Sequence, residues 1–311
     1  MRVACASTAG EPPAGSPRKA SAETMSRGRA QALLGALLLA PLLVFQAGCS
    51  SVRLAYDNAD TLLRWEAKSY LDIHGAQADE LDARIAAFLA WHRKAALPEY
   101  VKLATEAAAR VERGLSREDL VWGYDSTIRE LRETLRHAIG EGTELLDRLS
   151  EEQIVHLESR FAEDNRDFER EHLSGTPQKR RKERARRVVE RLEDWVGSLS
   201  DAQLERVALY SARAPLYDEQ RDREYRRRQA EFVAMLRAHQ ARERLADWAL
   251  EWERGRSPAY QAMVLAEREE LFDMLFDIDR TLSAEQRARA AARFRDYAAD
   301  FARLAAEGER K

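Results

Sequence analysis

Proline and glycine are scarce over most of this 311-residue chain. Beyond residue 48 there are only four prolines and nine glycines, and the remaining positions are dense in Ala, Leu, Glu and Arg. These four residue types are strong helix formers, and few helix breakers interrupt them. No run of alternating apolar and polar residues bounded by turn residues predicts a strand. The chain is therefore expected to be all-α, a multi-helix bundle of about eight or nine helices.

A short signature marks four of the expected helix starts. Leu-Ser occurs at residues 115, 149, 199 and 282, and in the last three copies a Gln follows the Ser by three residues. Such a Ser accepts a hydrogen bond from a first-turn amide while the Gln side chain accepts one from the Ser amide, an arrangement called a capping box. Helices should therefore begin near residues 116, 150, 200 and 283. Two more should begin at Thr176-Pro177 and Ser257-Pro258, because proline is well tolerated at the first helical position.

Pro98 lies inside another helical pattern that begins near Ala76. Proline lacks an amide donor and clashes with the preceding turn, so a break or kink is expected there. Trp91-His92 lies nearby and could line a pocket with Pro98-Glu99-Tyr100. A half-buried histidine with a hydrogen-bond partner is the simpler interpretation of His92.

An apolar run ends in small residues before Cys49. Two arginines precede the run, which extends from Ala30 to Phe45, and Ala47-Gly48-Cys49 follows it. A positive start, an apolar middle and a small-residue cleavage site make up a secretory signal. The ending resembles the lipobox of bacterial lipoproteins, in which a peptidase cuts before the cysteine and the thiol carries a diacylglyceryl group. The resemblance implies cleavage between Gly48 and Cys49 and a membrane anchor on Cys49.

Two features near this site leave alternatives open. Gln46 stands where lipoboxes usually carry Leu, and Ala30–Ala47 is 18 residues long, so an uncleaved anchor helix is the competing interpretation. Both interpretations export the body of the chain. By the same resemblance, Ser50 rather than Asp after the cysteine favours the periplasmic face of the outer membrane, with an inner-membrane anchor as the alternative.

The chain is expected to divide into four parts. Residues 1–24 have no apolar periodicity and are expected to be a disordered overhang upstream of the true start, Met25. Residues 25–48 are the signal peptide, residues 49–56 a short tether, and residues 57–308 one helical domain. The alternative for the first part is a long, disordered start to the signal.

Composition excludes several kinds of function for the part beyond residue 48. It carries 46 basic and 52 acidic side chains, a net charge of −6, which argues against nucleic-acid binding. Cys49 is its only cysteine, so no disulfide can form within it. No His-x-x-x-His pair is present and only one Glu-x-x-His, at Glu169–His172, so neither a metal nor a cofactor is expected.

Glu158-Ser159 resembles the Glu-Ser pair of helical lytic transglycosylases, but the Gly-Leu-Met-Gln turn of that family is absent. No catalytic residue is assigned, and the chain is not expected to be an enzyme.

The most unusual polar feature is a basic run in which seven of nine residues are cations. A helix start disfavours cations, so an anionic partner is predicted: lipid headgroups, lipopolysaccharide phosphates or the acidic segment Glu163–Glu171. Arg226-Arg227-Arg228 could join this surface. The alternative is a solvated face paired with nearby acids. The seven cations are Lys179, Arg180, Arg181, Lys182, Arg184, Arg186 and Arg187.

Several segments resemble one family of proteobacterial helical lipoproteins with a domain of unknown function. The resemblance implies the location and an all-helical fold, and it supplies no activity. Its most distinctive part is the Phe-Ala-Glu-Asp-Asn stretch, residues 161–165. The segments that carry it are Leu54–Asp60, Leu62–Trp65, Ala90–Arg93, Leu97–Tyr100 and His156–Asn165.

Three functions remain open at this point. The leading hypothesis is a lipid-anchored interaction or scaffold protein whose partners are the membrane and a protein or an anionic envelope component. The second is a membrane-tethered periplasmic chaperone, since the Leu-Ser-x-x-Gln copies resemble the Leu-Thr-x-x-Gln motifs of small periplasmic chaperones and metal-stress sensors. An envelope hydrolase is the third.

The position of the true start can be tested at the Met25 codon. Replacing this codon should abolish the mature protein, because translation would then have no start next to the signal. Immunoblotting of an epitope-tagged chain measures the outcome, with replacement of the Met1 codon as the control. Unchanged expression after the Met25 change, together with loss after the Met1 change, would contradict the prediction.

Overall fold

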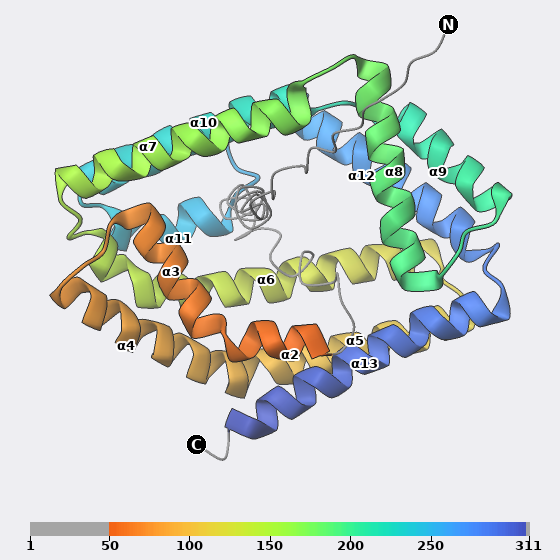
Figure 1. The fold of residues 1–311 in the computed structure, drawn as a ribbon, viewed down its shortest axis with the longest axis horizontal. Helices are drawn as coiled ribbons and strands as arrows, with labels where there is room; N and C mark the ends of the chain where they lie inside the picture. The colour runs from red at the N-terminus through yellow and green to blue at the C-terminus, as the bar shows by residue number, and fades with distance from the viewer. Residues whose placement is uncertain (1–49, 309–311) are drawn as a thin grey trace, which may run out of the picture.

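The computed structural model describes residues 50–308, and these residues form helices α2 to α13 with no β-strand among them (Figure 1). The all-α prediction is confirmed. The helix count is close to the eight or nine expected: eleven if α4 and α5, which a π-helical segment joins, are taken as one. The helices are α2 (Ser50–Asp57), α3 (Ala59–Leu71), α4 (Ala76–Trp91), α5 (Leu97–Arg113), α6 (Arg117–Leu146), α7 (Glu151–Phe168), α8 (Pro177–Val196), α9 (Asp201–Arg213), α10 (Asp218–Arg237), α11 (Ala241–Leu250), α12 (Pro258–Asp279) and α13 (Ala284–Gly308), with π-helical segments η1 (His92–Ala96) and η2 (Glu169–Leu173).

The helices are arranged as the sides of a frame (Figure 1). α7 and α10 lie along one side, and α8, α9 and α12 form the adjoining end. α5 and α13, the most extensively packed pair, lie on the opposite side with α2 and α4. α6, the longest helix at 30 residues, contacts α4, α11 and α12 and so connects different sides.

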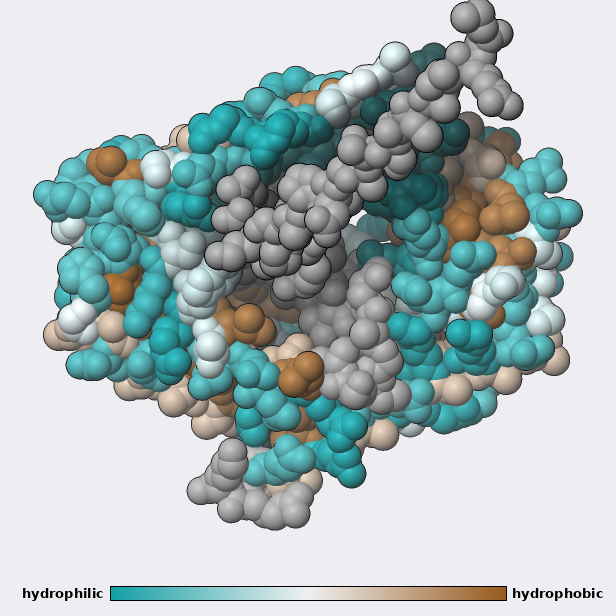
Figure 2. All heavy atoms as spheres, viewed as in Figure 1, coloured by the Kyte–Doolittle hydropathy of each residue, from teal (hydrophilic) through white to brown (hydrophobic). Residues whose placement is uncertain are grey.

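The buried apolar side chains are divided among separate clusters. The largest lies between α6, α7, α10 and α11 and includes Leu157 and Leu236. A second surrounds Leu97 and Leu304 where α5 meets α13, and a third surrounds Val207 where α8, α9 and α12 meet. Because most small domains have one contiguous core, the frame depends on the joints between its sides as well as on apolar burial. Figure 2 shows the matching surface pattern, mostly hydrophilic with small, separate hydrophobic patches.

The predicted helix starts are confirmed. Ser116, Ser150 and Ser200 each accept a hydrogen bond from the third helical amide, and the side chain at that third position accepts one from the Ser amide. Ser283 and Gln286 make the same reciprocal pair, at 3.1 Å in both directions. The starts at Thr176 and Ser257 are capped by their side-chain oxygens, with proline at the first helical position.

The glutamines of two capping boxes also bind each other. The Gln203 side chain accepts from the Ser200 amide (2.9 Å) and donates to the carbonyl of Thr281 (3.2 Å) and to Oε1 of Gln286 (3.1 Å). Gln286 donates back to Oε1 of Gln203 (3.2 Å) and to the carbonyl of Ser198 (2.9 Å). Gln203 is 1% exposed, so this amide pair fixes the starts of α9 and α13 together inside the protein.

Of the break or kink expected at Pro98, the break does not occur. α4, η1 and α5 form one unbroken helix from Ala76 to Arg113. The Leu97 amide donates to the carbonyl of His92, five residues earlier, instead of one four residues earlier. A proline ring ordinarily clashes with the carbonyl four residues before it, and here that residue, Lys94, lies in the widened turn. The π-helical segment therefore accommodates Pro98 without ending the helix.

The segment expected to be a short tether over residues 49–56 is helical from Ser50 onward. In α2, Val52 is 5% exposed and packs into the cluster that holds Leu97 and Leu304. Arg53 forms an ion pair with Asp300 of α13 at 3.2 Å. α2 is therefore fixed to the body. The expected signal peptide, its cleavage site at Gly48 and the lipid-bearing Cys49 lie outside the described residues.

The interlocked caps predict a large loss of stability in Gln203→Ala. The change removes the partner of the Ser200 amide, the Thr281 carbonyl and the Gln286 side chain, whose hydrogen bonds to Gln203 are partly buried, so the free energy of unfolding should fall by about 1–3 kcal/mol. Urea denaturation followed by circular dichroism measures this. The control is Glu205→Ala, an exposed position on the same helix, which should change stability by less than about 0.5 kcal/mol. Equal effects of the two changes would contradict the interlock.

Candidate functional site

The Phe-Ala-Glu-Asp-Asn stretch of α7 forms a joint between three helices. Phe161 is buried in the largest apolar cluster. Asp164 accepts a 2.6 Å hydrogen bond from the hydroxyl of Tyr70 in α3. Asn165 exchanges hydrogen bonds with Gln229 of α10, at 2.8 and 3.2 Å. The stretch therefore fixes α7 to α3 on one side and to α10 on the other, and we call it the α7 joint.

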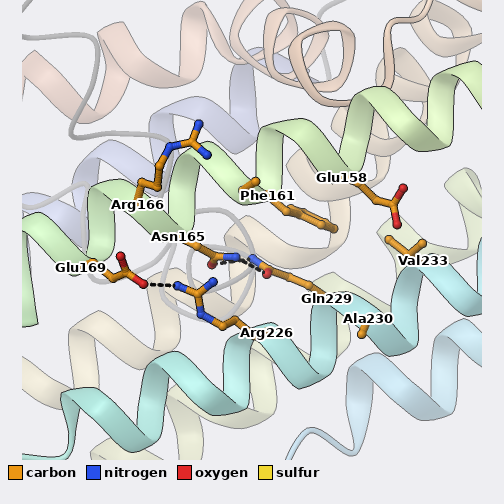
Figure 3. A pocket seen from close by; sticks show the side chains of 10 residues that line it. Glu158, Phe161, Asn165, Arg166, Glu169, Arg226, Gln229, Ala230 and Val233 are labelled. Atoms are coloured by element: carbon orange, nitrogen blue, oxygen red, sulfur yellow. Dashed lines mark hydrogen bonds and ion pairs between the residues drawn. The ribbon is translucent and has the colours of Figure 1, made fainter.

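A groove of about 390 Å³ runs beside this joint, between α7 and α10 (Figure 3). Both apolar and polar side chains line it. Figure 3 shows the Asn165–Gln229 pair and the Arg226–Glu169 pair bridging the two helices. The lining residues are Glu158, Phe161, Ala162, Asn165, Arg166, Glu169, Arg226, Gln229, Ala230 and Val233.

Most charged groups of the groove are paired with each other or with neighbouring residues. Arg226 donates to Glu169 (2.7 Å) and to Asp222 (2.8 Å). Glu158, the residue that resembles a transglycosylase acid, pairs with Arg237 at 2.9 Å, with both side chains about 40% exposed. A glycosidase acid works from an apolar pocket that raises its pKa, whereas Glu158 lies in an exposed ion pair. The ion pairs of Glu158 with Arg237 and of Glu169 with Arg226 therefore hold α10 against α7 and η2 at this groove.

An aromatic cluster surrounds the first residue of η1. The His92 Nδ1 and the Tyr56 hydroxyl of α2 share a 2.9 Å hydrogen bond. Trp91 stacks on His137 with ring centroids 3.9 Å apart, and the Tyr100 ring meets His92 edge-on. Burial lowers the pKa of His92 to about 4, so the ring is neutral at pH 7. His92 is thus a partly buried histidine with a hydrogen-bond partner, as expected, and it holds α2 against the widened turn.

A family model described as a family of unknown function, DUF6279, matches residues 69–261. The chain belongs to this family. The match begins within α3 and ends within α12, so it contains the α7 joint, the groove and the basic run. No curated protein and no solved structure matches the chain.

The basic run of this DUF6279 protein lies in the first half of α8 and divides between two faces. On the inner side, Arg184 donates to the carbonyls of Ser211 (2.7 Å), Ala214 (2.7 Å) and Pro215 (2.8 Å). Arg180, 13% exposed, pairs with Glu219 at 2.8 Å. These arginines fix α8 to α9 and to the start of α10.

The outer side of α8 remains cationic. Arg186 pairs with Glu183 and Glu190 of its own helix, and Lys179, Lys182 and Arg187 are exposed. Within residues 50–308, no ion pair joins the run to the acidic segment Glu163–Glu171 that was considered as its partner.

The second basic run, Arg226-Arg227-Arg228, binds residues within the DUF6279 protein itself. Arg227 pairs with Glu224 and Glu231 of its own helix. Arg228 donates to the carbonyl of Trp248 (3.0 Å) and lies 4.0 Å over the Trp248 ring. Arg226 binds Glu169 of η2 at the groove. The run therefore joins α10 to η2 and α11 and does not extend the cationic surface of α8.

The histidines form no visible metal site in the described part of the chain. There, no three His, Cys, Asp or Glu side chains come together in a metal-binding arrangement. His172, the end of the single Glu-x-x-His, packs 4.7 Å from the Phe168 ring, and burial lowers its pKa to about 4. None of the helices between residues 50 and 308 combines the length and apolar content that crossing a bilayer requires.

The α7 joint contains the most perturbed carboxyl group of the site. Burial raises the pKa of Asp164 to about 6, against the opposing effects of the Tyr70 hydrogen bond and of Arg160. Burial also raises the pKa of Glu66 on α3, and the charge of Asp164 adds to that rise. The folded state therefore holds a proton at Asp164 more tightly than the unfolded chain does.

The raised pKa of Asp164 predicts a pH-dependent effect of Asp164→Asn. The contribution of Asp164 to stability is full below about pH 4 and is lost as the pH rises through about 6, because the ionised carboxylate is partly buried. An amide can still accept from Tyr70 and carries no charge. Relative to the unmodified chain, the variant should gain about 1–2 kcal/mol in the free energy of unfolding between pH 4 and pH 7, a value reduced for solvent screening.

Urea denaturation at the two pH values measures this difference. Comparing variant with unmodified protein cancels the titration of His92 and His172, which destabilise the fold as the pH falls. Glu205→Gln, at an exposed position on α9 away from the joint, is the control and should show no such gain. A constant difference between Asp164→Asn and the unmodified protein across this pH range would overturn the prediction.

Proposed function

We propose that this chain is a lipid-anchored interaction or scaffold protein on the periplasmic face of the outer membrane. The observation that carries the proposal is the sequence from Leu42 to Ser50, which resembles a lipobox and follows a positive start and an apolar run. Proteobacterial lipoproteins are the relatives that the sequence resembles. The membership of DUF6279 is consistent with this proposal and assigns no activity.

The fixed position of α2 supports an anchored body. A lipid on Cys49 would be attached one residue before a helix that packs on α5 and α13 through Val52 and Tyr56. The body would then be held close to the membrane in a defined orientation. A protein that presents partners to a membrane benefits from such fixed geometry, because less rotational entropy is lost each time a partner binds.

The outer side of α8 is the proposed partner surface. Lys179, Lys182 and Arg187 are exposed there, whereas Arg180 pairs with Glu219 and Arg184 binds backbone carbonyls. Lys179 and Lys182 are three residues apart on one helix face, and like charges at this spacing repel each other, so an anionic envelope component or an acidic protein surface would relieve that repulsion.

A membrane-tethered periplasmic chaperone is the second candidate. It is favoured by exposed apolar side chains on α6 and α12: Val121 and Tyr124, three residues apart, and Leu265. α6 and α12 are in contact, and Arg268 of α12 lies 5.2 Å over the Tyr124 ring. Surfaces of this kind can bind unfolded clients.

The anchor is tested with Cys49→Ala in a Gram-negative host. The unmodified protein should incorporate a clickable fatty acid and fractionate with the outer membrane, whereas the variant should lose the label. Cys5→Ala is the matched control and should retain both properties, because Cys5 lies upstream of the expected cleavage site. A labelled variant, or an unlabelled unmodified protein, would contradict the lipid anchor.

The two candidate activities separate in further measurements. Cross-linking in envelopes should capture a partner whose recovery falls when Lys179, Lys182 and Arg187 are changed together to Gln. For a chaperone, the purified protein should instead suppress aggregation of a denatured client, and Tyr124→Ser should weaken that suppression. No suppression at all would remove the chaperone candidate.

A further inference from the structure

α3 carries large apolar side chains that the frame leaves uncovered. Leu62 is 53% exposed, Trp65 is 57% exposed, and no side chain of α3 is buried. Leu54 on the preceding α2 is 66% exposed. Figure 2 shows hydrophobic side chains at the surface over α2 and α3. We call Leu54, Leu62 and Trp65 the apolar edge.

Two contacts on other sides of α3 determine which side stays open. Arg64 pairs with Asp82 of α4 at 2.5 Å, and Tyr70 donates to Asp164 of α7 at 2.6 Å. Leu62 and Trp65 are three residues apart and so lie on neighbouring positions of one helix face. Asp60 is about 200° around the helix from Leu62, which leaves it away from the apolar side.

The position of the apolar edge along the chain indicates what covers it. α2 begins at Ser50, one residue after the proposed lipid-bearing cysteine, and is held to the body by Val52 and by the Arg53–Asp300 ion pair. At 1.5 Å per helical residue, Leu54 lies within about 10 Å of that cysteine and Trp65 within about 25 Å. No flexible segment between Ser50 and Tyr56 separates the anchor from this edge. The membrane that holds the lipid would therefore lie beside α2 and α3.

We infer that the apolar edge of α2 and α3 inserts into the interfacial region of the bilayer in which Cys49 is anchored. The inference rests on the proposed lipid anchor. Helices that lie in a membrane interface place Leu and Trp at the boundary between headgroups and acyl chains. Trp suits this position because one part of its ring is apolar and its N–H can reach water or headgroups. The anchor supplies the affinity, and the apolar edge sets the orientation of the frame on the membrane.

The experiment measures the depth of one side chain in a bilayer. The processed protein with Leu62→Cys is labelled with an environment-sensitive fluorophore and reconstituted in vesicles of phosphatidylethanolamine and phosphatidylglycerol, with or without brominated acyl chains. Lipidation blocks the thiol of Cys49 and cleavage removes Cys5, so the engineered thiol is the only reactive one. Leu204→Cys on α9, an exposed leucine at the far end of the frame, is the matched control (Figure 1).

Brominated lipid should quench the fluorophore at position 62 by about half, because an interfacial side chain reaches the acyl boundary, and should leave position 204 nearly unchanged. Equal and weak quenching at both positions would overturn the inference. A protein partner, rather than the bilayer, would then be the occupant that covers the apolar edge. Strong quenching at both would overturn it as well, because the apolar edge would then not set the orientation.

The anchor and the docking are distinguished by mass spectrometry of the same samples. A lipidated Cys49 with no quenching at position 62 leaves the proposed anchor intact and removes the docking. If Cys49 is unmodified, the proposed anchor is wrong, and the docking that rests on it fails with it.

Discussion

The stability of this frame depends on buried side-chain amides at the ends of its helices. Gln203 caps α9 and binds the start of α13, while Gln153 caps α7 and donates to the carbonyls of Leu71 and Asp72 at the end of α3. Apolar burial is divided among several clusters, so no single core fixes every helix in place. The polar joints supply the missing constraint. A buried amide left without its partner costs about 1–3 kcal/mol, which makes such joints specific.

Local physics explains which parts of the fold the sequence predicts. The helix starts at Ser150, Ser200 and Ser283 follow from hydrogen bonds within four residues, so a short motif is enough to locate them. The second partner of each glutamine lies about 80 residues away, and no local pattern encodes it. The π-helical turn before Pro98 was missed for the same reason. A proline in the sequence indicates only that a regular α-helical turn is unfavourable before it. Whether the helix ends there or widens into a π-helical turn depends on how the surrounding helices pack.

The candidate site shows the same division. The Phe-Ala-Glu-Asp-Asn stretch is recognisable in the sequence, but its role as a joint depends on Tyr70 and Gln229, which are distant in the chain. The sequence alone could predict part of the arrangement of the basic run. Arg180 and Arg184 are four residues apart and share a helix face, so helical spacing alone indicates that one side could turn inward. That this side binds carbonyls at the end of α9 required the structure.

The division of the core has a consequence for how the molecule moves. Where each corner is packed separately, one corner can open while the others keep their amide protons protected from exchange with solvent. The α5–α13 pair, with Leu97 and Leu304 almost fully enclosed, would exchange last, and α3 would exchange among the first. Local opening of one corner is therefore separable from unfolding of the whole frame, and hydrogen exchange would divide the molecule along the boundaries of its apolar clusters.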